Sequence, residues 1–353
     1  MNAKNEKKPE YHDKPAKLDK CYGLVLSDGI DLGPYQAGVL SHYTKAMLEI
    51  NQTYNFISGV GVGGINAFLF AQQNDSNKNL SLDEIKNFWK HAAEKNHYSE
   101  RSTGFLYSLF FEDSLYESTG ISQILSKFIQ NKPFNKGFSI GITNILDGHF
   151  RVFNENQTFS DLLKVLHASI TYPGVSELVD EFDALWLSGS TVYEADLNSA
   201  ILRCEKLGYK EERIVIDVVL SIDPIIPHQM AKLNNGFQNL GRAIQLQSKY
   251  EMLYGVIRSK QSHPKMEFRY ISGPSEDVAS KNHPFDYNGR EIDYLYDLGI
   301  KDAKKSIENR DLILESLSPI FFSEFDPTKT TQKREKNLHQ ESGFLQDDIK
   351  LIE

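Results

Sequence analysis

The residues with the clearest chemical potential form a glycine-rich turn at positions 59–64, where the sequence reads GVGVGG. An apolar segment precedes this turn, another follows it, and Asp83 and Glu84 come about twenty residues later. That order satisfies the G-x-G-x-x-G pattern, in which backbone N–H groups and a helix N-terminus hold the pyrophosphate of a dinucleotide. Nucleotide binding at Gly59–Gly64 is therefore one hypothesis for this chain.

Two features of the surrounding sequence count against a nucleotide site. A dinucleotide-binding turn normally lies on the first strand-to-helix connection of its unit, whereas here a strand, a loop and a helix at 22–48 come before it. In addition, no Lys-Ser or Lys-Thr pair follows either glycine loop, so the sequence lacks a Walker-type phosphate cradle. Nucleotide binding at Gly59–Gly64 is thus only weakly supported by the sequence.

The segments that must position these residues alternate between strands and helices. Apolar runs predict strands, and segments with one apolar face predict helices. The predicted strands are 22–26, 54–58, 138–144, 151–154, 185–187, 214–222 and 268–272. The predicted helices are 35–48, 65–72, 82–94, 121–130, 162–169 and 236–258. This alternation predicts an α/β fold in which helices cover both faces of a central, mostly parallel sheet.

Five segments, taken in order, carry a resemblance to a known family. They read LSDGIDLGPYQAGVL at 26–40, ISGVGVGGINA at 57–67, IGITN at 140–144, ASITYPG at 168–174 and LSGS at 187–190. In these segments the chain resembles the patatin-like phospholipases, and the resemblance covers residues 22–305. It implies a three-layer α/β/α domain of patatin-like type.

The resemblance also implies where an acyl hydrolase would keep its reactive groups. Family members use a Ser-Asp dyad, with the serine at the centre of a G-x-S-x-G elbow and the aspartate opening a D-G-G or D-G-A loop. Here the elbow consists of Gly59, Gly61 and Gly63, so its centre has no nucleophile. The segment that resembles the aspartate loop begins with Ser188, which cannot accept a proton at neutral pH. We therefore expect no catalytic residue at either position.

A third element of the family is a G-G-G-x-R-G loop whose backbone N–H groups bind the developing oxyanion. The corresponding segment keeps two glycines, has leucine in place of the arginine and gains carboxylates. Carboxylates have the wrong charge beside a forming anion, so this segment also favours an inactive member of the family. The residues of this former oxyanion loop are Asp28, Gly29, Ile30, Asp31, Leu32 and Gly33.

Several polar side chains near these loops are candidates for a replacement site. Ser58 precedes the elbow, and we expect its hydroxyl to bond to the backbone rather than to react. His167 lies in an apolar pattern that is more typical of a core or surface histidine than of a catalytic base. The other candidates are Ser27, Ser169, Asp183 and Asp196. Their spacing supports no Ser-His-Asp arrangement.

The charge balance excludes one class of function. The 353 residues include 39 basic and 48 acidic side chains, which gives a formal net charge of −9. A nucleic-acid-binding surface normally needs a basic excess or a basic stripe, so we expect no nucleic-acid partner. The histidines show no paired spacing typical of metal ligands, and we expect neither a metal nor a cofactor.

Cysteine content and apolar segments predict the location. Cys21 and Cys204 are too few for a disulfide scaffold and favour a reducing compartment. Residues 1–20 contain no apolar core of a secretory signal and do not resemble a transit peptide. The most apolar segments, 56–71 and 214–226, are interrupted by glycine or aspartate, unlike a membrane-spanning helix. We therefore expect an intracellular, cytoplasmic protein without a transmembrane segment.

The chain divides into a polar, flexible arm at 1–20, the patatin-like domain at 21–305 and a polar extension at 306–353. A folded domain without catalytic groups can still bind other molecules, so we expect a structural or interaction subunit of a larger assembly with protein partners. The alternatives are a lipid acyl hydrolase with a non-standard site, or a protein that holds a lipid in its cleft. The extension carries apolar anchors that would order on a partner or pack on the domain: Phe321, Phe322, Phe325, Phe344 and Leu345.

Overall fold

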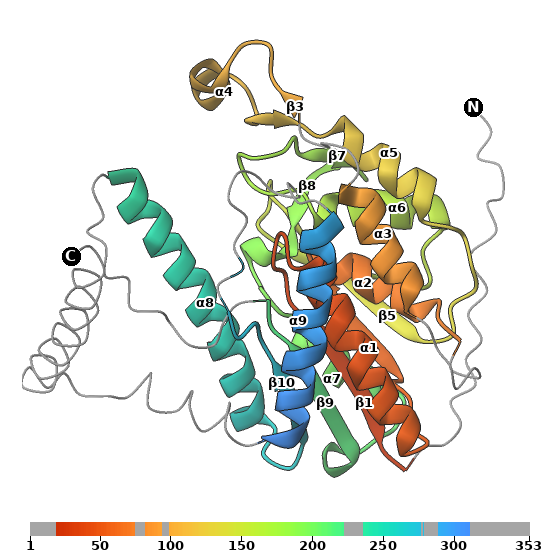
Figure 1. The fold of residues 1–353 in the computed structure, drawn as a ribbon. Coiled ribbons are helices and arrows are strands. Elements are labelled where there is room, and N and C mark those ends of the chain that lie inside the picture. The colour runs from red at the N-terminus through yellow and green to blue at the C-terminus, as the bar shows by residue number, and fades with distance from the viewer. Residues whose placement is uncertain are drawn as a thin grey trace, which may run out of the picture. The chain divides into compact units, whose positions relative to one another are not determined.

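The computed structural model of the chain describes residues 19–74, 82–93, 99–221, 236–276, 278 and 289–310, and Figure 1 shows its ribbon. Most of the strands in these residues belong to one sheet. They are β1 (Cys21–Leu26), β2 (Phe56–Val60), β5 (Gly137–Asn144), β6 (Phe150–Asn154), β7 (Val179–Glu181), β8 (Ala184–Ser188), β9 (Ile214–Val219) and β10 (Glu267–Ser272). Two short strands, β3 (Ser99–Glu100) and β4 (Tyr116–Glu117), pair with each other.

The main sheet is mostly parallel. Its strand order is β10-β9-β1-β2-β5-β8-β7, and β6 pairs with β5 outside that path. The strands β10, β9, β1, β2 and β5 run parallel, while β8, β7 and β6 join antiparallel. Because parallel strands end at the same edge of a sheet, the loops after β1, β2 and β5 meet there. We call this edge the carboxyl end of the sheet.

Helices cover both faces of the sheet, as the alternation of side chains along β1 shows. Leu24 and Leu26 belong to the core cluster that includes α1, α2 and α9. Cys21 is bonded to Cys204 of α7, and a Cβ added at Gly23 would lie 3.3 Å from Cβ of Ala200, also on α7. Successive side chains of a strand point to opposite faces, so α7 covers the other face. The helices are α1 (Gly33–Glu49), α2 (Val62–Ala71), α3 (Asp83–Ala93), α4 (Phe105–Phe111), α5 (Thr119–Phe128), α6 (Phe159–Ser169), α7 (Leu197–Lys206), α8 (Gly236–Ser262) and α9 (Gly289–Glu308).

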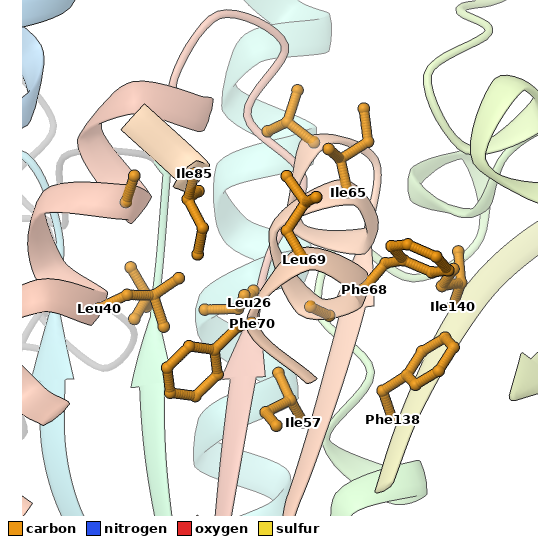
Figure 2. Close-up of a cluster of buried hydrophobic side chains, with 14 of the residues drawn as sticks. Leu26, Leu40, Ile57, Ile65, Phe68, Leu69, Phe70, Ile85, Phe138 and Ile140 are labelled. Carbon is orange, nitrogen blue, oxygen red and sulfur yellow. The ribbon is translucent and has the colours of Figure 1, made fainter. Parts of the chain in front are cut away.

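The helix α2 is central to the hydrophobic core, and every residue in it is buried. Figure 2 shows Phe68 of this helix beside Phe138 and Ile140 of β5. The ring centroid of Phe68 lies 5.6 Å from that of Phe138 and 5.2 Å from that of Phe134, both edge to face. Except for Asn66, the side chains of α2 are apolar on every side, and such a helix must be enclosed by other elements. The elements that enclose α2 also fix the glycine turn at its N-terminus.

The predicted fold class is confirmed: a central, mostly parallel sheet is flanked by helices. The helices α4, α7 and α9 and the short strands β3, β4 and β7 were not predicted from the sequence. Among the described residues, no helix combines the length and apolar character needed to cross a bilayer. Residues 1–18 and 311–353 lie outside the described part of the chain, so the arm and the extension stay predictions.

One expectation from the sequence requires correction. Cys21 and Cys204, which suggested a reducing compartment, form a disulfide between β1 and α7, with their Cα atoms 5.8 Å apart. Both residues are fully buried. The packing of α7 on β1 brings these two distant positions together, and the number of cysteines in the sequence does not reveal that contact. Disulfides persist in oxidising compartments, so this pairing counts against the cytoplasmic location expected above.

Candidate functional site

The glycine turn connects β2 to α2, with Gly61 between the two elements. Gly61 has φ +60° and ψ −132°, a backbone conformation that residues with a side chain rarely adopt. Its neighbours are needed for close packing: a Cβ at Gly59 would lie 2.1 Å from the carbonyl oxygen of Gly63. A Cβ at Gly63 would lie 2.5 Å from the carbonyl oxygen of Leu26. The elbow glycines therefore serve the fold at each of these three positions.

The space beside Gly61 is filled by a carboxylate from another loop. A Cβ added at Gly61 would lie 1.8 Å from Oδ1 of Asp28, 1.9 Å from its Cγ and 2.4 Å from its Oδ2. Asp28 follows β1 and is buried. The carboxylate thus occupies the volume in which a side chain at the centre of the elbow would begin.

Backbone N–H groups converge on the same carboxylate. Oδ1 of Asp28 accepts the N–H of Gly29 at 2.6 Å, that of Ile30 at 3.3 Å and that of Val62 at 3.4 Å. Val62 is the residue directly after the elbow centre, and its N–H lies at the N-terminus of α2, where negative charge is stabilised. These donors have the arrangement of an oxyanion hole, and here their acceptor is Asp28.

Two hydroxyl groups complete the surroundings of the carboxylate. The hydroxyl of Tyr172 donates to Oδ1 and that of Ser188 donates to Oδ2, each at 2.9 Å. Ser188 ends β8, and its hydroxyl is also 2.9 Å from Oγ of Ser190. Ser188 is therefore a hydrogen-bond donor to Asp28, at the position where the family resemblance places a catalytic base.

The loop at 28–33, which the family resemblance matches to an oxyanion loop, is held against the helices by buried amides. Gln36 of α1 donates to the carbonyl oxygen of Ser27 at 2.7 Å, and Asn66 of α2 donates to that of Gly33 at 3.0 Å. A Cβ at Gly33 would lie 2.1 Å from the ring of Trp89, so only glycine fits at this point. Buried polar groups that are satisfied in this way hold a loop in one conformation.

Glu194 adds a second carboxyl group at this place. Its carbonyl oxygen accepts the N–H of Asp28 at 2.8 Å, and its side chain accepts a hydrogen bond from Ser248 of α8. Burial raises the pKa of Glu194 to about 8, with a further contribution from the negative charge of Asp28. Glu194 is therefore mostly protonated at neutral pH.

The other candidates from the sequence have structural partners or lie elsewhere. Ser58 donates to the carbonyl oxygen of Asp196 at 2.6 Å, and Ser169 donates to that of Gly61 at 2.9 Å. Asp196 caps α7 by accepting the N–H of Ser199. Ser27 donates to the backbone of Asp28, and Asp183 lies in the turn between β7 and β8. None of these described contacts forms a replacement Ser-Asp dyad.

The donors of the site surround the carboxylate of Asp28, and this arrangement does not favour a bound phosphate or metal ion. A pyrophosphate at the glycine turn would meet the charge of Asp28, which already uses the N–H groups that would hold it. Within the described residues, no group of three or more His, Cys, Asp or Glu side chains is arranged to hold a metal ion. Tyr172 and Glu194 were not predicted as site residues, because their contacts with Asp28 form only when distant loops meet.

Comparisons with known proteins add to this picture. The family model described as patatin-like phospholipase matches residues 24–200 of the chain. Among solved structures, the chain is similar to VipD from Legionella pneumophila, with 10% identity, a TM-score of 0.39 and coverage of 88% of this chain and 72% of that one. It is also similar to the type III effector protein ExoU, with 10% identity, a TM-score of 0.32 and coverage of 84% of this chain and 54% of that one. A search of the curated proteins finds no match.

A first prediction concerns the carboxylate of Asp28. Asp28→Ala leaves buried N–H and hydroxyl donors without an acceptor, each at a cost of about 1–3 kcal/mol. We expect the free energy of unfolding to fall by about 2–4 kcal/mol, and acetate or formate to raise the Tm of the variant but not of the unchanged chain. Thermal unfolding with chloride at equal ionic strength is the control. An equal response to chloride would contradict the assignment of a carboxylate site.

A second prediction concerns Glu194. An acid with a raised pKa in the folded protein keeps its proton while the unfolded chain loses it, so stability falls as pH rises. We expect the free energy of unfolding to decline between the ordinary pKa of 4.5 and the raised value of about 8. Glu194→Gln should remove this part of the decline. Denaturant titrations across that pH range measure both proteins, and identical slopes would show that Glu194 is not the group responsible.

Proposed function

This chain belongs to the patatin-like phospholipase family, and we propose that it is a member that does not hydrolyse lipid esters through a Ser-Asp dyad. One observation carries the proposal: the carboxylate of Asp28 fills the space beside Gly61. It also accepts the N–H groups of Gly29 and Val62, which an oxyanion would need. A single side chain therefore blocks two requirements of the reaction.

Both requirements follow from the chemistry of acyl transfer. The reaction needs a nucleophilic oxygen at the turn and free donors where negative charge develops on the substrate carbonyl. Gly61 supplies no oxygen, and the donors already face an anion. A second negative charge at the same place would be repelled. Hydrolases that lose such groups lose on the order of 10⁴–10⁶ in rate.

Ser188 is the hydroxyl that most resembles a nucleophile, because it is hydrogen-bonded to the carboxylate of Asp28. Its side chain is 0% exposed, so a substrate carbonyl has no route to the oxygen unless the loops move. The N–H groups nearby are engaged by Asp28. These contacts support a structural role in which Ser188 fixes the carboxylate.

We further propose that the chain acts as a structural or interaction subunit of a larger assembly. The support is that packing and hydrogen bonds within the domain hold the buried core and the glycine turn, and a fold of this kind can be used without its chemistry. The apolar anchors expected to contact a partner lie in 311–353, outside the described residues. Their role is a proposal from the sequence.

The test of inactivity is a series of variants treated with a serine-hydrolase probe and assayed on phospholipid and short-chain esters. We expect no labelling of the unchanged chain, and none of Gly61→Ser, whose Cβ would clash with Asp28. Combining Gly61→Ser with Asp28→Gly and Ser188→Asp restores the dyad groups, and labelling should appear only there. Stoichiometric labelling of the unchanged chain that Ser188→Ala abolishes would overturn the proposal.

The assembly role is tested by the native size of the protein in extracts of its source. We expect the chain to migrate in a complex much larger than its mass of 40.2 kDa. Deletion of residues 326–353 should release it, since that segment carries part of the proposed contact surface. Migration of the unchanged chain as a monomer would contradict the assembly role and leave the inactivity proposal untouched.

A further inference from the structure

Aromatic side chains of α4 lie on the surface instead of in the core. Phe110 and Phe111 are 72% and 73% exposed, and Tyr107 is exposed as well. The ring centroids of Tyr107 and Phe111 are 5.0 Å apart, so their aromatic surface is continuous. Single exposed apolar residues are ordinary, but large ones gathered within five residues of chain indicate an interaction surface.

This helix is carried by an arm, residues 99–117, that begins with β3 and ends with β4 (Figure 1). Arg101 holds the base of the arm: its guanidinium lies 2.8 Å from carboxylate oxygens of both Asp113 and Glu177. Glu177 belongs to the loop between α6 and β7, so the ion pairs attach the arm to the main domain. The aromatic side chains are therefore presented on a fixed support.

The base of the arm adjoins the candidate site. The N–H of Leu115 donates to the carbonyl oxygen of Gly174 at 2.9 Å, and that of Tyr116 donates to the carbonyl oxygen of Val175 at 3.0 Å. The same loop carries Tyr172, whose hydroxyl donates to Asp28. The arm therefore extends from the carboxyl end of the sheet, where the glycine turn lies.

Other loops at the carboxyl end also expose apolar side chains. Two of these loops follow the parallel strands β1 and β5. The third follows β8 and returns to the same edge, where the carbonyl oxygen of Glu194 accepts the N–H of Asp28. The exposed side chains on these loops are Ile30, Ile145, Leu146 and Tyr193. The carboxyl end of the domain thus exposes several apolar side chains on separate loops, in addition to Tyr107, Phe110 and Phe111 of α4.

The charge of the arm indicates what kind of surface it meets. Residues 102–111 contain no charged side chain, and the charge of Arg101 is paired with carboxylates. Attraction to anionic lipid or nucleic acid needs unpaired basic residues. We propose that the carboxyl end of the domain docks on a zwitterionic phospholipid surface, with Tyr107, Phe110 and Phe111 inserted at the interface.

A lipid surface fits these features better than a protein groove does. Phenylalanine and tyrosine are favoured where the acyl region meets the headgroups, because they combine apolar area with tolerance of a wet edge. A projecting helix can enter a deformable surface while the other apolar loops contact the same plane. Docking of this kind does not rest on the absence of hydrolysis.

The test is co-flotation of the full chain with phosphatidylcholine vesicles. We expect binding that Phe110→Ser combined with Phe111→Ser weakens by at least about ten-fold, since the apolar area of two rings is lost. A matched control is Ile50→Ser combined with Leu202→Ser, whose side chains are 54% and 51% exposed. Both positions lie toward the opposite end of the sheet: Ile50 follows α1, and Leu202 precedes Cys204 of α7, which is bonded to Cys21 at the start of β1. The control variant should bind like the unchanged chain, and added salt or phosphatidylserine should have little effect.

Several outcomes would overturn docking on neutral lipid. These are no binding by the unchanged chain, equal losses in the two variants, or binding only when anionic lipid is present. Self-association that depends on Phe110 and Phe111 without vesicle binding would assign the surface to a second copy of the chain instead. Thermal unfolding of both variants confirms that each remains folded, as expected for exposed positions.

Discussion

The space beside Gly61 admits one group, and the carboxylate of Asp28 occupies it. Segments far apart in the sequence depend on this contact. The loop after β1 supplies the carboxylate, the turn between β2 and α2 supplies the space and the N–H of Val62, and the end of β8 supplies the hydroxyl of Ser188. A change at any one of these positions alters the fit of the others. The site is therefore one packing unit rather than a set of independent residues.

Burying a carboxylate is costly unless donors surround it. Asp28 meets this condition with backbone N–H groups on one oxygen and hydroxyl groups on both. The loop after β1 stays in place because Gln36 of α1 and Asn66 of α2 donate to its carbonyl oxygens. The hydrogen bonds from the donors around Asp28 offset the free-energy cost of removing the carboxylate from water. This explains why a charged side chain can lie inside the domain.

Local patterns in the sequence predicted the sheet and most helices, because apolar periodicity reflects the face that each element buries. The resemblance to the patatin-like phospholipases, rather than this periodicity, identified Gly61 and Ser188 as unusual residues for an acyl hydrolase. Neither the periodicity nor the resemblance could show that Asp28 lies against Gly61, since that contact joins two loops through strand pairing. For the same reason the disulfide between Cys21 and Cys204 was missed. The sequence therefore predicted which residues are unusual, but it did not predict the contacts between residues far apart in the chain.

The carboxylate also explains how the glycine turn keeps its shape without a substrate or a nucleophile. A buried N–H group that has no acceptor lowers the stability of the folded protein by about 1–3 kcal/mol. A chain with glycine at 61 and nothing in the space would leave the buried N–H group of Val62 and the part-buried N–H group of Gly29 without this acceptor. Asp28 supplies the missing acceptor and fills the missing volume together. The group that stabilises the turn is thus the same group to which the proposed inactivity is attributed.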